Sequence, residues 1–326
     1  MMMTPAPGPS RRTALGFLGA ALVLPRAGFA GGVDTLSGAA FGTHWRIAGA
    51  PGGGLGHLAP AVETLFAGID RKFSPWRPDS AISLFNAAPS GARAADPALI
   101  EVTAAALEIA RLSGGAFDPT VGPLVARWGF GPIERGGAPE WRGLSAGPEG
   151  LAKTRADLTL DLCGIAKGWA LDRASRLARD AGLDDLLLDL GGEFIAFGQH
   201  PDGRDWRIAV ESPLDAHPAP AALRLPSGIA VATSGVRAQS YVLNGRIYSH
   251  IIDPETRAPA AGRLRSVTVA AENAMTADGW ATALCAAGDV AGPDLAAAQG
   301  IAALFLFEDD GTLRQVRTGP IGDLIL

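Results

Sequence analysis

The chain is poor in cysteine and has no long hydrophobic run. Its 326 residues include only Cys163 and Cys285, too few for a disulfide framework or a cysteine-rich metal site. A single bridge suits an oxidising compartment, but Cys163 lies in a motif and Cys285 in an apolar helix, so we expect two small buried side chains. The apolar run over residues 14–24 is shorter than the roughly 20 residues that span a bilayer. We therefore expect a soluble protein without a membrane anchor.

Positive charge is also scarce, and lysine above all. The formal net charge is −5, and among 28 basic residues only Lys72, Lys153 and Lys167 are lysines. This acidic balance argues against a nucleic-acid partner. Because arginine is the usual cation in this chain, Lys167 indicates a position that requires lysine in particular. A compact ammonium approaches a phosphate more closely than a guanidinium. A solvated helix lysine is the plainer interpretation.

The first 30 residues look like an export signal. Arg11 and Arg12 precede the apolar run, which is followed by Gly28-Phe29-Ala30, with small residues at the ends of that triplet. This pattern is typical of twin-arginine export. We predict a signal peptide over 1–30, a mature domain over 31–326 and a periplasmic location; cleavage lowers the formal net charge from −5 to −8. The alternative is a disordered start followed by a buried helix.

Hydrophobic periodicity indicates a mixed fold. Apolar residues at spacings of three and four, or an apolar stretch of helical length, predict helices over 58–72, 97–112, 166–181 and 276–287. Short apolar or alternating runs predict strands over 43–47, 185–190, 206–211, 228–233, 264–271 and 302–308. Because these elements do not alternate in a regular βαβ order, we predict an α+β fold with a largely antiparallel sheet.

Two motifs carry groups suited to a phosphate and a metal. In DLCGIAKGWALD, residues 161–172, glycines let backbone groups approach a ligand at a helix N-terminus, where anions are favoured. In TADGWAT, residues 276–282, Asp278 and Thr282 are four residues apart and share a helix face. Their oxygens are of the hard type that Mg²⁺ prefers. A structural role for both within their own helix is the alternative.

Two further motifs place a carboxylate and a histidine near turns. Asp118, in GGAFDPTVGPL over 114–124, either accepts hydrogen bonds from a ribose or amide or simply forms a turn with Pro119. His250, in SHIIDPETRAP over 249–259, lies three residues before Asp253, which can orient it as a base near neutral pH. A structural histidine beside a turn is the alternative.

Together these motifs resemble the ApbE family, the FAD:protein FMN transferases. The likeness also takes in Phe41-Gly42-Thr43, Ser74-Pro75-Trp76, Asp189–Gly192 and Thr233-Ser234-Gly235, so eight motifs follow in order over nearly the whole mature chain. The resemblance implies an α+β fold with FAD in a cleft between two lobes. It also implies cleavage of the FAD pyrophosphate, transfer of FMN to a threonine or serine of a target protein, and release of AMP.

The resemblance also assigns roles by motif position. Asp278 and Thr282 correspond to Mg²⁺ ligands, together with the backbone carbonyl of Gly164. His250 corresponds to the base, with Asp253 as its orienting partner. Lys167 would contact phosphate. The positions that correspond to FAD contacts are Phe41, Trp76, Ala116, Phe117, Asp118, Asp161 and Ile252.

Three positions depart from the family pattern. Phe41 stands where methionine is usual, Val236-Arg237 replaces Asp-Tyr after Ser234-Gly235, and Arg257 replaces the glycine of a DPxTG turn. An aromatic residue at position 41 should keep contact with the flavin. The other two changes imply an altered loop and an altered bend. None of them removes a metal ligand or the base.

The principal hypothesis is a periplasmic flavin transferase that acts on an exported or membrane-bound redox flavoprotein. The export signal is similar to that of the NosX subgroup, which implies a client in nitrous-oxide respiration. One alternative is a Mg²⁺-dependent FAD pyrophosphatase, in which water replaces the acceptor hydroxyl. Another is an assembly factor that binds FAD without chemistry, although storage alone needs no base.

Overall fold

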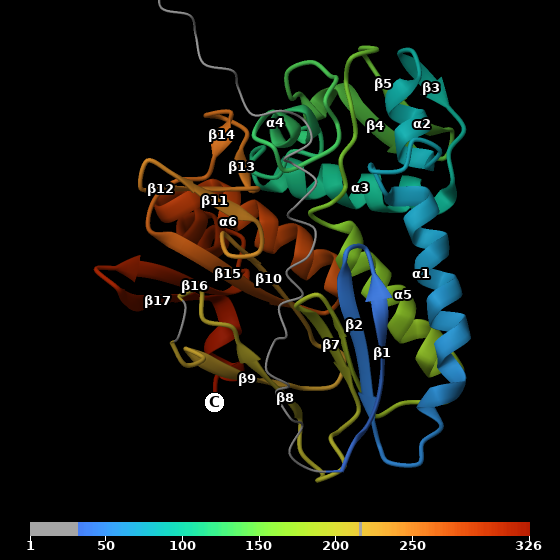
Figure 1. Ribbon diagram of the computed structural model, residues 1–326, viewed down its shortest axis with the longest axis vertical. Coiled ribbons are helices and arrows are strands. Elements are labelled where there is room, and N and C mark those ends of the chain that lie inside the picture. The colour runs from blue at the N-terminus through green and yellow to red at the C-terminus, as the bar shows by residue number, and fades with distance from the viewer. Residues whose placement is uncertain (1–31, 215–216) are drawn as a thin grey trace, which may run out of the picture.

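An eight-stranded antiparallel sheet forms the centre of the computed structural model, which describes residues 32–214 and 217–326 (Figure 1). Its strand order is β1-β2-β6-β7-β10-β15-β16-β17, and each neighbouring pair is antiparallel. The strands are β1 (Asp34–Ala40), β2 (Thr43–Gly49), β6 (Leu186–Leu190), β7 (Glu193–Phe197), β10 (Ala230–Gly235), β15 (Leu264–Ala271), β16 (Ala302–Asp309) and β17 (Thr312–Thr318). The predicted α+β class with an antiparallel sheet is confirmed.

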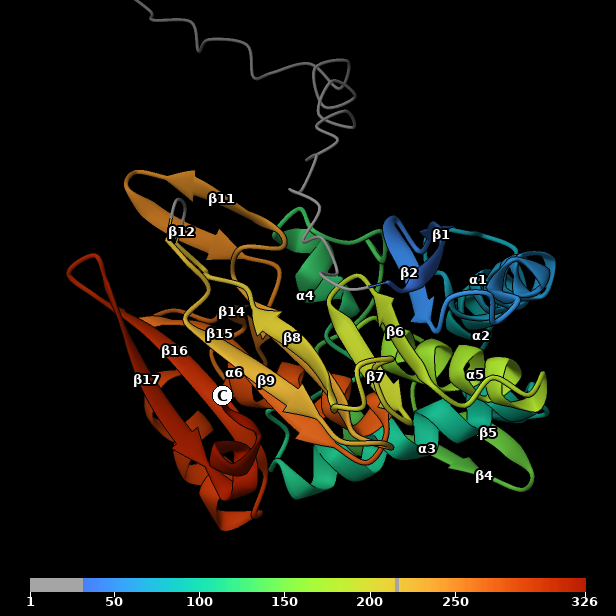
Figure 2. The ribbon, with the colours of Figure 1, turned by 90° about the horizontal axis from the view of Figure 1, so that it is seen from below.

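Helices and small sheets surround this sheet. The helices are α1 (Ala59–Phe73), α2 (Ala81–Ala87), α3 (Pro97–Leu112), α4 (Gly122–Arg127), α5 (Ala166–Asp180) and α6 (Ala274–Ala298), with 3-10 turns η2 (Leu55–Leu58), η3 (Trp141–Gly143) and η4 (Gly319–Leu324). The small sheets are β3-β5-β4 (Gly91–Arg93, Gly150–Lys153, Leu144–Gly147), β8-β9 (Trp206–Val210, Ala221–Leu225), β11-β12 (Ser240–Leu243, Arg246–Ser249) and β13-β14 (Ile252–Asp253, Ala258–Pro259). In Figure 2 the β11-β12 hairpin stands out from the body beside α4.

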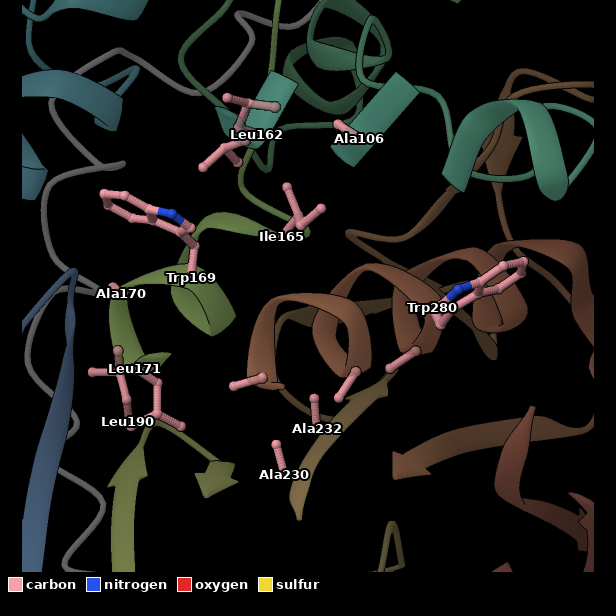
Figure 3. Close-up of a cluster of buried hydrophobic side chains, with 14 of the residues drawn as sticks. Ala106, Leu162, Ile165, Trp169, Ala170, Leu171, Leu190, Ala230, Ala232 and Trp280 are labelled. Atoms are coloured by element: carbon pink, nitrogen blue, oxygen red, sulfur yellow. The ribbon is translucent and has the colours of Figure 1, made fainter. Parts of the chain in front are cut away.

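Alternation along the strands gives the sheet two buried faces. Leu188 and Phe305 point into the core beneath the helices. Their neighbours Leu187 and Leu304 point into a second core, which β8-β9 and η4 cover. Figure 3 shows the first core, where α6 lies over the small side chains of Ala230 and Ala232 on β10. Small residues on β10 let the helices approach the sheet closely.

Helix α5 fixes the start of α6. Both carboxylate oxygens of Asp172 accept hydrogen bonds from the first turn of α6, at 2.8 Å from Ala274 N and 2.9 Å from Met275 N. Asn273 caps the same turn by accepting from Thr276 N at 2.8 Å. A Cβ on Gly168 would lie 2.2 Å from the Ala274 carbonyl oxygen, so only glycine permits this approach. The first turns of the two helices are thus held together.

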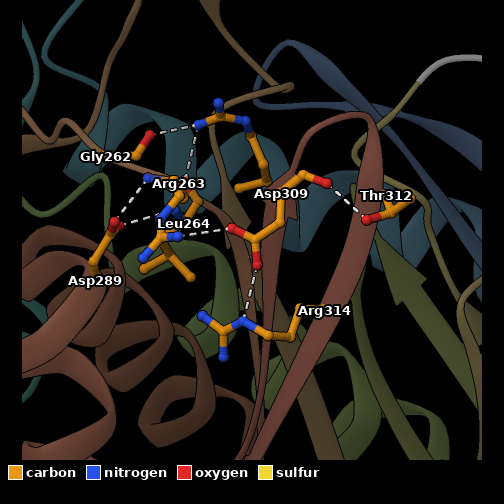
Figure 4. Close-up of polar contacts among 8 residues, drawn as sticks. Gly262, Arg263, Leu264, Asp289, Asp309, Thr312 and Arg314 are labelled. Atoms are coloured by element: carbon orange, nitrogen blue, oxygen red, sulfur yellow. Dashed lines mark hydrogen bonds and ion pairs between the residues drawn. The ribbon is translucent and has the colours of Figure 1, made fainter.

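The far half of α6 is longer than the sequence pattern predicts. The predicted helix ends at 287, but the structure continues to Ala298 through a break at Gly288, whose φ is 78°. Beyond the break, Asp289 accepts from Arg263 N and Leu264 N, each at 2.8 Å. Figure 4 shows this contact beside the ion pairs of Asp309 with Arg263 and Arg314. The Asp289 bonds hold the second half of α6 against the start of β15.

The predictions for the N-terminal segment, a membrane span and the two cysteines compare with the structure in different ways. The predicted signal peptide, 1–30, lies outside the described residues. None of the described helices is long and apolar enough to cross a bilayer. Both cysteines are free, and Cys285 is buried as predicted, but Cys163 is exposed. The prediction of a buried Cys163 is therefore wrong, because the turn before α5 leaves this residue at the surface.

Candidate active site

The three predicted metal-binding positions lie together where α5 begins against α6. The Thr282 hydroxyl donates to the Gly164 carbonyl at 3.2 Å. Asp278, one turn earlier on α6, is 3% exposed and accepts from Gly168 N at 2.9 Å. Ser234 of β10 is an addition that the motif assignment did not make, with its hydroxyl 3.2 Å from that of Thr282. One carbonyl, one carboxylate and two hydroxyls thus gather at the start of α5.

This set fits Mg²⁺ better than a transition metal. The described residues hold no cluster of three or more His, Cys, Asp or Glu suited to a metal. The donors are instead hard oxygens and few in number, which suits an ion that keeps several positions for water or substrate phosphate. A Cβ on Gly164 would lie 2.9 Å from Thr282 Cγ2 and 3.3 Å from Phe117 Cε2, so glycine is required for its carbonyl to lie here.

Burial makes the carboxylate of Asp278 receptive to positive charge. Removal from water raises the pKa of Asp278, while the nearby charge of Lys167 and the Gly168 N–H lower it. A buried anion is costly unless cations or donors compensate it. A divalent cation beside Asp278 would supply that compensation and favour the ionised form.

Lys167 is fixed by a residue that the motif assignment missed. Its ammonium pairs with the carboxylate of Glu193 on β7, which is 2% exposed. Burial alone would lower the pKa of Lys167, but the charges of Glu193 and Asp278 raise it above its usual value. Burial raises the pKa of Glu193 to about 7 despite Lys167, and its Oε2 is buried without a partner within the described chain. The sequence feature that could have identified Glu193 is its position directly after Gly191-Gly192.

His250 is positioned as a neutral base. It follows β12, and its backbone N–H donates to the Gln239 carbonyl at 3.1 Å. Its Nδ1 lies 3.2 Å from the same oxygen, so a proton on Nδ1 leaves Nε2 as the acceptor. Burial lowers the pKa of His250, Lys167 lowers it further, and only the Gln239 carbonyl raises it. The imidazole is therefore unprotonated at neutral pH and able to take a proton.

The structure does not join Asp253 to His250. The Asp253 carboxylate accepts from Glu255 N at 2.9 Å and from the Thr256 hydroxyl at 2.8 Å, which closes its own turn. The Gln239 carbonyl occupies the orienting position that the sequence assigned to Asp253. The same turn corrects a second expectation, since Arg257 has φ 59° and so adopts the left-handed backbone of the glycine it replaces.

Two of the predicted FAD-contacting carboxylates shape their own loops. Asp118 is 8% exposed and accepts from Thr120 N at 2.8 Å and from the Thr120 hydroxyl at 2.5 Å. Burial raises its pKa, against the lowering effect of these bonds. Asp161 accepts from Cys163 N at 3.0 Å, and its own N–H donates to the Pro119 carbonyl at 2.7 Å. The two motifs therefore form one joined loop, with buried Phe117 against Gly164.

The remaining predicted FAD positions differ in exposure. Phe41, at φ 53° in the β1-β2 turn, packs its ring edge-on against Phe66 at 5.4 Å. Trp76, after α1, is 61% exposed, an unusual state for an indole that ligand stacking would relieve. Ala116 is half-buried and Ile252 is buried on β13. Their roles toward FAD stay predictions, as does the cleft between two lobes.

A cavity elsewhere in the fold holds none of these residues. It measures about 500 Å³ and lies at the β3-β5-β4 sheet, lined by Ser90, Arg142, Lys153 and neighbours. Lys153 is itself buried, and its ammonium donates to the carbonyls of Asn86, Ala156 and Leu158 at 2.8–3.0 Å. Lys153 is therefore structural, in contrast to Lys167.

Sequence relatives share one description. A protein of Klebsiella pneumoniae described as "FAD:protein FMN transferase" is 32% identical over 313 residues, covering 88% of this chain and 89% of its own. A protein of Vibrio cholerae with the same description is 35% identical over 294 residues, covering 85% and 88%. The described site motifs thus lie within a likeness that extends over most of both chains.

A solved structure and a family model agree with these relatives. The flavin transferase ApbE from Vibrio cholerae superposes with a TM-score of 0.80 at 32% identity, covering 90% of this chain and 100% of that one. The model of the ApbE family matches residues 41–305, a span that includes every predicted site residue. The chain therefore belongs to the ApbE family.

Proposed function

We propose that this protein transfers FMN from FAD to a hydroxyl of an acceptor flavoprotein and releases AMP. One observation carries the proposal: the Gly164 carbonyl, the Thr282 hydroxyl and the buried Asp278 meet at the start of α5, one turn from Lys167. Relatives of similar length are described as FAD:protein FMN transferases. The donor set suits a diphosphate substrate, because such sites combine hard oxygen ligands with a cation for phosphate.

The reaction exchanges the phosphoanhydride bond of the FAD pyrophosphate for a phosphoester to the acceptor. The acceptor hydroxyl oxygen forms a bond to the FMN phosphorus, the P–O bond to the AMP phosphate breaks, and AMP leaves with the bridging oxygen. His250 Nε2 takes the proton of the hydroxyl, because Nδ1 faces the Gln239 carbonyl and the lowered pKa keeps the ring neutral. Lys167 binds phosphate oxygens from a position that Glu193 fixes.

We infer that Mg²⁺ is the metal of the site. Gly164, Asp278 and Thr282 would hold it, leaving positions for pyrophosphate oxygens. When bound, Mg²⁺ neutralises phosphate charge and improves AMP as a leaving group. The oxygen-only donor set supports a divalent cation here, and the buried Glu193 Oε2, which has no partner within the described chain, adds negative charge near Asp278.

The setting is a proposal drawn from the sequence. The twin-arginine pattern over 1–30 supports export to the periplasm. There the acceptor would be an exported or membrane-bound redox flavoprotein, modified at a threonine or serine. The likeness to the NosX subgroup supports a component of nitrous-oxide respiration as that acceptor.

Mass spectrometry of the acceptor tests the transfer. The purified protein is mixed with FAD, Mg²⁺ and candidate exported flavoprotein domains, and AMP is measured with and without each domain. We expect an FMN-sized mass gain on one domain that requires Mg²⁺ and is lost in His250→Ala. AMP without a mass gain would identify an FAD pyrophosphatase instead. Tight FAD binding with neither product would identify an assembly factor.

A further inference from the structure

The β11-β12 hairpin exposes apolar side chains next to His250. Val242 is 69% exposed, Leu243 55% and Ile247 39%. They form a cluster at the outer end of a hairpin whose inner end carries Gln239 and His250 (Figure 2). Apolar clusters of this kind on a projecting element are typical of interaction surfaces.

One face of the hairpin is held by stacked aromatic rings. Trp128 stacks on Tyr248 at 5.6 Å, Tyr248 on Tyr241 at 5.5 Å, and Tyr241 on Phe130 at 5.3 Å. Phe130 then meets the His250 ring edge-on at 6.4 Å. Tyr241 and Tyr248 are the only two tyrosines in the chain. The stack ties the hairpin to the segment after α4, so the hairpin is a supported platform beside the base.

The outer edge of β11 presents unpaired backbone groups. His250 N–H bonds to the Gln239 carbonyl, and bonded and non-bonded pairs alternate along an antiparallel ladder. The register pairs Tyr241 with Tyr248 and Val242 with Ile247. Ser240 and Val242 are therefore non-bonded positions, and their N–H and C=O groups point away from β12. Within the described chain no third strand joins this sheet, and β11 is exposed throughout.

We propose that β11 binds the acceptor flavoprotein, by pairing with an extended segment that flanks the modified hydroxyl. This inference rests on the proposed transfer reaction. An added strand satisfies the free groups of Ser240 and Val242, and its apolar side chains cover Val242, which shares one face of the hairpin with Ile247. Because β11 starts directly after Gln239, which orients His250, a segment that leaves this edge is delivered to the base. The acceptor segment is thus extended and apolar on one face.

Two substitutions at Val242 separate the apolar contact of the acceptor segment from its backbone hydrogen bonds. Val242→Lys places a charge in the apolar contact. Val242→Pro removes an N–H that points outward, so it spares the bonds between β11 and β12, and proline is tolerated on an edge strand. The matched control is Val290→Lys, since Val290 is 74% exposed on α6 and lies outside the hairpin. Circular dichroism and FAD affinity are measured for all three variants.

Steady-state kinetics use the acceptor domain that the wild-type protein modifies. We expect both Val242 variants to raise the KM for the acceptor by about tenfold, the effect of roughly 1.4 kcal/mol of lost contact. In these variants the kcat and the KM for FAD should change less than about twofold. The kinetic constants of Val290→Lys should also stay within about twofold of the wild type. An unchanged acceptor KM in both Val242 variants overturns the inference while leaving the transferase intact.

Three other outcomes would also overturn it. If sedimentation shows a wild-type dimer that Val242→Lys converts to monomer without a change in acceptor KM, a second copy of this chain covers the hairpin. If the variants weaken binding to anionic vesicles but not to the acceptor, the surface binds lipid. If the wild-type protein modifies no acceptor at all, the proposed function fails first and this inference fails with it.

Discussion

The start of α6 and the β11-β12 hairpin carry different halves of the proposed reaction and are built in opposite ways. At α6, Asp278 is buried and the helix start is held by Asp172 and Asn273. At the hairpin, four consecutive residues of β11 are exposed, and His250 directly follows the partner strand β12. Phosphate and metal chemistry needs fixed, desolvated charges, whereas a protein substrate needs an accessible surface. In the proposed reaction, the molecule therefore holds FAD with its core and the acceptor with its periphery.

Asp278→Ala should have the largest effect, because it removes the only carboxylate of the proposed metal set. We expect a loss of Mg²⁺-dependent turnover of about 10³-fold, the effect of several kcal/mol of charge stabilisation. Asp294→Ala, on the exposed side of the same helix, is the control and should be active. AMP release against Mg²⁺ concentration measures both. Normal turnover of Asp278→Ala with Mg²⁺ would refute the metal assignment.

His250→Ala tests the peripheral half. Transfer should fall by about 10²–10³-fold through loss of general-base catalysis, while FAD affinity, which depends on the core, should stay within about twofold. Because the folded pKa of His250 lies below 6.5, wild-type transfer should be at its plateau at pH 7 and fall only at lower pH. A rate that still rises steeply above pH 7 would exclude His250 as the titrating base.

Glu193→Gln tests whether Lys167 needs its partner. We expect transfer to fall about tenfold, because Lys167 loses the charge that positions it. Stability should respond as well: the pKa of Glu193 is about 7 when folded and 4.5 as a free side chain. The folded state therefore binds the proton more tightly, and wild-type stability declines as pH rises from 4.5 through 7.

Urea unfolding at pH 5 and pH 8 measures that decline. Glu193→Gln, which cannot titrate there, should show a smaller difference between the two pH values than the wild type. Equal differences in both proteins would mean that Glu193 does not retain its proton in the fold. Lys153→Gln would serve as a poor control, because Lys153 holds three backbone carbonyls.

Arg257→Gly should have the smallest effect and should act on the periphery alone. Arg257 is exposed with φ 59°, a backbone state that costs a side-chain-bearing residue about 1–2 kcal/mol. Glycine removes this strain but has a more flexible unfolded state, so we expect a net gain of about 0.5–1 kcal/mol in unfolding free energy. Urea unfolding with unchanged FAD affinity would bear this out. A loss of stability would show that interactions of the arginine side chain outweigh the cost of its left-handed backbone conformation.

The sequence predicted the core better than the periphery. The helix over 97–112 and the strand over 264–271 have their predicted bounds. In long periodic segments the spacing of apolar residues follows which side chains are buried. Strands β1, β7 and β17 were not predicted, because each is the partner of a stronger strand and its pattern is weaker. Edge strands such as β11 depend on a turn and a stack of rings that only tertiary contacts create.

The same difference applies to the site. The spacing of Asp278 and Thr282 on one helix was enough to bring them together. Ser234, Glu193 and Gln239 lie on separate strands or loops, so no spacing along one element brings them together, and only Glu193 had a local signal, its position after Gly191-Gly192. The sequence also paired His250 with Asp253 because they are close in the chain. The turn instead directs the Asp253 carboxylate back to its own backbone.

The double cap that Asp172 places on α6 has a consequence for how the protein matures. Asp172 and the start of α6 are separated by 102 residues, so this contact forms only after much of the chain has been made and collapsed. Contacts between such distant segments carry a large closure entropy and form late. We therefore expect a partly folded chain to lack this cap on the helix that carries Asp278. Such a chain should not cleave FAD, so that the ability to consume the cofactor arises together with the completed fold.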